Sequence, residues 1–157
     1  MATIKSLTGA GWLKDADDNF QSLKSLAGLH ITPFVFDTAA NDAGTEPASN
    51  KTVAAHPLAV TIPAKAIVLG GHLDVITAVT SATKKSTVAI HLANEADVLT
   101  TTEGAEANLK LAAQIPMAAL KAAPIKLAAA KPVTVTVGTE ALTAGKINGY
   151  IIWIEGE

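Results

Sequence analysis

Two amino acids are absent from this sequence of 157 residues, and each absence excludes classes of function. Without cysteine, the chain has no disulfide, no thiolate zinc site and no cysteine nucleophile. All 12 basic residues are lysine, so the chain lacks arginine, the usual bidentate reader of phosphate, carboxylate and guanine. Because the net charge is -2 and the lysines form no dense cluster, we expect no nucleic-acid partner.

Charged residues and long apolar runs are also scarce. Charged residues make up 17% of the chain, below the roughly 25% of an ordinary soluble domain, while 49% of residues are apolar. This balance predicts a surface covered by another molecule, such as a second copy of the chain, although an alanine-rich monomer has the same composition. No apolar run approaches the roughly 18 to 20 residues of a membrane span, and the N-terminus contains no signal-peptide core. We therefore expect a soluble protein without a membrane partner and without export.

Aromatic residues are few, at 4%, and most of them fall in the first 50 positions. That segment contains Trp12, Phe20, Phe34 and Phe36. Acidic residues followed by spaced apolar ones predict a short helix over 15–26, and the turn formers at 37–52 predict a loop or linker. The sequence thus predicts an N-terminal arm, a docking segment with its linker, over residues 1–52.

Residues 53–157 have the pattern of an all-β domain. Apolar and polar residues alternate, or β-branched residues cluster, over 58–62, 66–80, 86–93, 132–138 and the last dozen or so residues. The glycine pair at 70–71 predicts a bulge or bend. Residues 105–131 are predicted as loops and short strands, with room for one helical turn. About six to eight strands with turns between them indicate an antiparallel β-sandwich or jelly roll.

Polar residues gather at two places without forming a catalytic pattern. One group follows a strand and comprises His91, Asn94, Glu95 and Asp97. The alternation places His91 opposite the apolar row of its strand, facing solvent or a neighbouring subunit, and the other three fit a turn. His72 and Asp74 share one strand face within hydrogen-bond reach, but no serine lies in a nucleophile turn. The sequence therefore predicts no catalytic residue, no metal site and no cofactor.

The stretch "IPAKAIVLGGHLDVITAVTSATKKSTVAIHLANEADVL" at 62–99, followed by "KPVTVTVGTEALTAGKINGYIIWIE" at 131–155, resembles a group of tailed-bacteriophage virion proteins. These share an "IPAGA"-like start, an "ANDLL"-like turn and a closing "ITVTVGTAALTAGKI" pair of strands. Lys65 departs from the pattern, where small residues are usual, and "TSATKKST" replaces a Gly/Ser loop. The resemblance implies a jelly-roll or β-sandwich module that decorates or cements a capsid, commonly as a trimer, and it implies no catalytic residue.

On this resemblance we expect a non-enzymatic protein made in the host cytoplasm and carried on the capsid surface of the virion. Its partners would be the major capsid protein and further copies of itself. A tail or fibre module that binds a receptor or carbohydrate is the alternative. The aromatic residues of the arm and the outward residues of the last strand are the expected interface: Trp12, Phe20, Phe34, Phe36, Tyr150, Ile152 and Ile154. The four arm aromatics serve equally well as a lid over the sandwich core.

Overall fold

The computed structural model describes residues 28–40, 49–93, 98–116 and 124–157. The chain divides into two units, Met1–His30 and Ile31–Glu157. Trp12, Phe20 and the helix predicted at 15–26 lie outside the described residues. Within those described, the chain forms eight strands and one short 3-10 turn, and no α-helix. None of the described segments is a helix long and apolar enough to span a bilayer.

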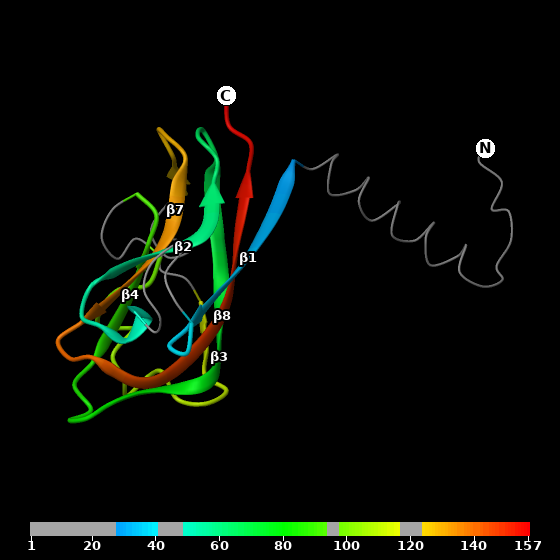
Figure 1. The fold of residues 1–157 in the computed structure, drawn as a ribbon. Coiled ribbons are helices and arrows are strands. Elements are labelled where there is room, and N and C mark those ends of the chain that lie inside the picture. Colours follow the sequence, from blue (N-terminus) through cyan, green and yellow to red (C-terminus); the bar gives the residue numbers. More distant parts are fainter. Residues whose placement is uncertain (1–27, 41–48, 94–97, 117–123) are drawn as a thin grey trace, which may run out of the picture. The chain divides into compact units, whose positions relative to one another are not determined.

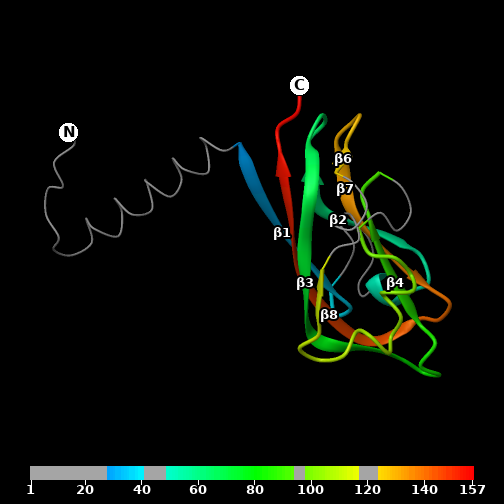
Figure 2. The same ribbon diagram turned by 180° about the vertical axis from the view of Figure 1, so that it is seen from behind.

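The strands form two sheets that face each other (Figure 1). One sheet has the order β1-β8-β3-β5, with β6 also paired to β3, and the other has the order β2-β7-β4. Figure 2 shows the same two layers from behind. The bounds are β1 Leu29–Asp37, β2 Ala55–Ile62, β3 Ile67–Ser81, β4 Thr87–His91, β5 Gln114–Pro116, β6 Ile125–Lys126, β7 Lys131–Gly138 and β8 Leu142–Ile154, with the 3-10 turn η1 at Ser49–Lys51.

Strand pairing is nested along the chain. β1 pairs with β8, β2 pairs with β7, and β3 pairs with β6 as well as with β8. The edge of β4 is covered by two isolated bridges, Thr87 to Ala105 and Ile90 to Leu99. A long hairpin of nested pairs wound into two sheets is the topology of a jelly roll. The predicted all-β sandwich is therefore confirmed.

The core lies between the two sheets and follows from the period-2 alternation of the strands. β7 buries Val133, Val135 and Val137 while the threonines between them are partly exposed. β8 buries Ile147 and Ile151 from the opposite sheet. Because successive side chains of a strand point to opposite faces, this alternation alone assigns one side of each sheet to the core.

β1 belongs to the five-stranded sheet, although its residues precede the linker that the sequence predicts at 37–52. Phe34 and Phe36 are 2% and 0% exposed and are part of the core, whereas Pro33, directly before Phe34, is exposed. Gly149 of β8 leaves space for Phe34, because a Cβ atom there would lie 2.4 Å from its Cζ. Proline is tolerated in β1 because the strand lies at the sheet edge.

β3 contains the bulge predicted from its glycine pair. Its register with β8 shifts between Val68 and Gly70, and Gly70 has a φ of 148°. The shift keeps Val68 and Leu73 buried while His72 points to the other face. Glycine suits this position because its φ is rarely adopted by residues with a side chain.

Candidate functional site

The outward side of the five-stranded sheet is unusually apolar for a surface. We use the name outer face for the outward side chains of β1, β8, β3 and β5. Among its large hydrophobic residues, Ile31 is 44% exposed, Val35 is 51% exposed and Tyr150 is 39% exposed. Exposed apolar side chains gathered on one face of a sheet are typical of an interaction surface. The outer face is therefore the leading candidate for a binding surface.

β8 supplies the centre of the outer face because both of its sides are apolar. Ile151 and Trp153 point into the core, and Ile152 and Ile154 are partly exposed on the other side. The Trp153 indole Nε1 donates a hydrogen bond to Oγ1 of Thr32 at 2.8 Å, which joins β8 to β1. A sheet that faces water on one side needs only one apolar face. Packing within the sandwich therefore does not account for the apolar residues on the outward side of β8, which the sequence also showed.

A hydrogen-bonded chain of three polar residues lies on the outer face. His72 and Asp74 both project from β3, and β5 brings Gln114 beside them. The His72 Nε2 contacts Oε1 of Gln114, and the Gln114 Nε2 donates to Oδ1 of Asp74 at 2.5 Å. The glutamine therefore bridges the two residues that the sequence expected to pair directly. Nothing in the sequence of the Ala- and Pro-rich segment 105–131 singles out Gln114.

Tyr150 completes this cluster from β8. Its ring centroid lies 6.1 Å from that of His72, to which it is directly opposite in the β3–β8 register, with a 32° angle between the ring planes. A shallow hollow of about 250 Å³ opens here. Its walls and floor are formed by Pro33, His72, Asp74, Asn148, Gly149 and Tyr150. The hollow combines an aromatic wall with polar groups, which is the general make-up of a recognition site.

The contacts of the cluster are those of a hydrogen-bonded recognition surface. The Nε2 of His72 contacts an amide oxygen, whereas a nucleophile–base pair requires a hydroxyl or thiol there. Among the described residues, no group of three or more histidine, aspartate or glutamate side chains is arranged to hold a metal ion.

The polar residues near the end of β4 do not form a described site. His91 ends β4 and is partly buried, and Ala89 on the same face is 5% exposed, so this side of the strand is more covered than the alternation predicts. Asn94, Glu95 and Asp97 lie outside the described residues.

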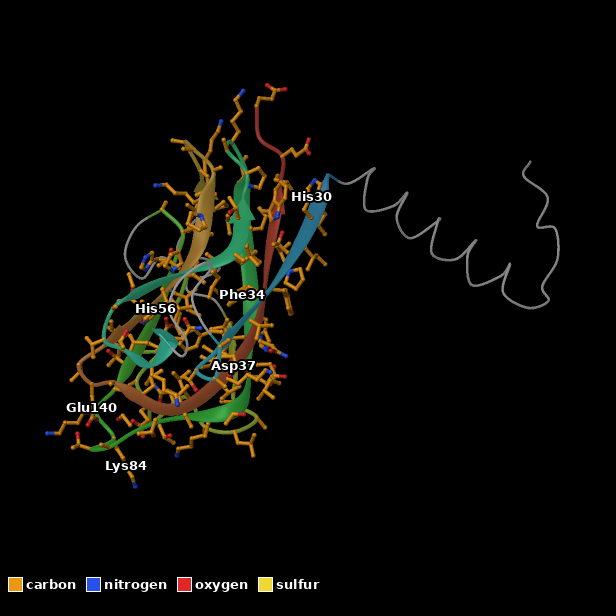
Figure 3. All side chains as sticks on the ribbon, in the orientation of Figure 1. His30, Phe34, Asp37, His56, Lys84 and Glu140 are labelled. Atoms are coloured by element: carbon orange, nitrogen blue, oxygen red, sulfur yellow. The ribbon has the colours of Figure 1, made fainter. Side chains whose placement is uncertain are left out.

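A second polar cluster holds the loop between β3 and β4. The Glu106 carboxylate accepts hydrogen bonds from Ser81 Oγ at 2.6 Å and Ser86 Oγ at 2.9 Å. Glu140, from the loop between β7 and β8, accepts from the backbone N–H of Thr83 at 3.0 Å and from its Oγ1 at 3.0 Å. Figure 3 shows Glu140 beside Lys84 at this end of the sandwich. These bonds join the end of β3 and the neighbouring loops to one another, so we assign the cluster a structural role.

The expected interface residues are divided by the structure between the core and the surface. Phe34 and Phe36 are buried in the core, whereas Trp12 and Phe20 lie outside the described residues. Tyr150, Ile152 and Ile154 lie on the outer face. The outer face therefore retains the candidates from β8 and adds Ile31, Val35, His72, Asp74 and Gln114.

The architecture defines the class of this chain as an antiparallel two-sheet jelly roll. Solved structures share it: a chain of the cyanophage Pam1 capsid asymmetric unit aligns with a TM-score of 0.55 at 18% identity, over 81% of this chain and 84% of that one. A chain of the acidic stable capsid structure of Helicobacter pylori bacteriophage KHP30 aligns with a TM-score of 0.53 at 14% identity, over 82% and 89%. No family model matches the sequence. No curated protein matches it either. The likeness to these capsid chains is one of fold.

Proposed function

We propose that this chain is a structural protein of a bacteriophage virion that binds the capsid shell. The observation that carries the proposal is the shared fold, which spans 81% and 82% of this chain in the two capsid comparisons. The phage-like motifs at 62–99 and 131–155 agree with it, and these segments contain β3, β4, β7 and β8. In this role the protein is non-enzymatic and is located on the capsid surface after synthesis in the host cytoplasm.

The proposed mechanism is cementing, in which each copy bridges neighbouring subunits of the major capsid protein. Many weak contacts made together resist the pressure of packaged DNA far better than any single contact. The outer face supports this role because burial of its apolar residues against the shell lowers the free energy of the complex. The N-terminal segment with Trp12 and Phe20 remains a predicted second contact. We further propose that copies associate as a trimer, which light scattering of the purified protein measures directly.

Shells assembled without this protein provide the test. Purified protein should bind them and raise the temperature at which they lose their contents. Two matched substitutions separate the outer face from the rest of the surface: Val35→Asp places a carboxylate on the outer face, and Val53→Asp places one at a site of similar exposure, 54% against 51%. We expect at least about tenfold weaker shell binding for Val35→Asp, because a charge must then be desolvated, and unchanged binding for Val53→Asp. Failure of the unmodified protein to bind shells, or its recovery in the tail fraction of purified particles, would overturn the proposal.

A further inference from the structure

Asp74 and Asn148 line the hollow and carry hydrogen-bond acceptors. The amide of Gln114 uses its oxygen toward His72 and its nitrogen toward Asp74. Because the Gln114 oxygen can only accept, the His72 Nε2 donates to it. Among the described residues, Oδ2 of Asp74 has no hydrogen-bond partner. The exposed amide of Asn148, opposite Asp74 in the β3–β8 register, adds a further carbonyl oxygen.

An aromatic surface stands beside these acceptors. The Tyr150 side chain is 39% exposed and forms one wall of the hollow, with Pro33 of β1 among the other lining residues. The face of an aromatic ring carries partial negative charge and attracts cations within about 6 Å of its centre. The exposed lining of this hollow of about 250 Å³ is mainly apolar, with Tyr150 as one wall, and Asp74 and Asn148 are also among its lining residues. This combination is complementary to a planar cation that carries several donors.

We propose that the hollow receives an arginine side chain of a neighbouring shell subunit, an inference that rests on the proposed function and names the chemistry of its contact. A guanidinium presents five N–H donors in one plane and stacks on aromatic rings, so it can engage Asp74 and Tyr150 together. A lysine ammonium is a compact charge with a strong hydration shell and matches spread acceptors less well. This chain contains no arginine, so the donor belongs to a different protein and not to a second copy.

The surroundings of the hollow favour such a contact. The three polar residues on β3 and β5 already satisfy part of one another's hydrogen-bonding capacity, which lowers the cost of removing them from water. Ile152, two residues after Tyr150 on the same side of β8, continues the apolar outer face next to the hollow. A buried charged contact surrounded by apolar groups that exclude water is the usual arrangement of an interface hot spot.

Shell binding by single variants tests the inference. Asp74→Asn removes the charge but keeps an oxygen that can accept from Gln114, so the fold should be retained. We expect about ten- to hundredfold weaker binding to shells that lack this protein. Tyr150→Leu keeps an apolar side chain but removes the π surface, and we expect about tenfold weaker binding. Glu157→Gln makes the same charge change at an exposed residue outside the hollow and should bind as the unmodified protein does.

A small-molecule competition identifies the cation. Methylguanidinium chloride should displace the unmodified protein from shells at lower concentrations than methylammonium chloride at equal ionic strength. Equal competition by the two salts, or shell binding unchanged by both Asp74→Asn and Tyr150→Leu, would overturn the arginine contact and leave shell binding intact. Absence of shell binding by the unmodified protein would instead refute the proposed function itself. Urea unfolding curves of each variant confirm that a loss of binding does not arise from a loss of fold.

Discussion

Replacing Gly149 with alanine should destabilise the sandwich through one close approach in its core. A Cβ atom at this position would lie 2.4 Å from Cζ and 2.7 Å from Cε1 of Phe34, and 2.8 Å from Cδ2 of Leu73. Both neighbours are buried, with 2% and 0% exposed, so neither can move out into solvent. Overpacking of this kind costs about 1–3 kcal/mol, and a stiffer unfolded chain offsets about 0.4–1 kcal/mol of it. We expect a net loss of about 1–2 kcal/mol in the free energy of unfolding.

A double-mutant cycle with Phe34→Leu identifies the cause of this loss. Leucine lacks the two ring atoms that approach Gly149 most closely, so the alanine should cost less when leucine occupies position 34. We expect the double variant to be at least about 1 kcal/mol more stable than the sum of the two single effects predicts. Asn148→Ala, at the exposed neighbouring position, is the control and should change stability by less than about 0.5 kcal/mol.

Urea unfolding followed by tryptophan fluorescence measures these differences, because Trp153 lies in the core beside the same strands. The midpoints should shift while the slope m stays constant, since the surface exposed on unfolding is unchanged. A neutral Gly149→Ala substitution, or strictly additive effects in the cycle, would show that Phe34 does not pack against β8 as described.

Three further predictions concern the polar groups. Asp37 accepts the N–H of Ala39 at 2.9 Å and pairs with Lys146 at 3.0 Å, and these contacts hold the pKa of its carboxyl below the ordinary value of 3.8. A carboxyl group with a lower pKa in the folded state stabilises the fold at pH values above its unfolded pKa. This stabilisation is lost as the pH falls through the folded pKa. The difference in stability between the unmodified protein and Asp37→Asn should therefore shrink as the pH falls from about 5 to about 2. Because this pair is partly exposed, the difference should not exceed about 1 kcal/mol. Glu140→Ala should speed hydrogen exchange of the Thr83 amide with little effect on the strands, and protection equal to that of the unmodified protein would contradict the described loop contact. Adding EDTA should leave the melting temperature unchanged, and a fall in it would reveal a structural metal.

The strands with regular alternation were predictable from sequence, whereas β1, which contains a proline, was not. The valine and threonine alternation of β7 and the two apolar sides of β8 identify these strands without further information. β1 has the same period-2 pattern at Phe34 and Phe36, but Pro33, directly before them, argues against a strand. That rule holds for central strands, and β1 lies at an edge. Knowledge of which strand is at the edge requires the tertiary fold.

The hollow could be predicted only in part for a related reason. His72 and Asp74 lie two residues apart, so their common face follows from the strand period. Their partners come from far along the chain, since Gln114 is 42 residues from His72 and Tyr150 reaches it through the β3–β8 register. The short strand β5 has no pattern of its own over its three residues. Its position depends on pairing with β3, which local sequence does not encode.

The nested pairing also determines when the outer face can form during synthesis. β8 leaves the ribosome after the seven other described strands, yet it occupies an inner position between β1 and β3. Its partner β1 lies more than 100 residues earlier in the chain, so closing this pair requires a large loss of chain entropy and makes folding slow. An unfinished chain cannot present Tyr150 or Ile152 at all. Synthesis of β8 therefore acts as a checkpoint, because only a copy that already includes β8 carries the surface that it would use in assembly.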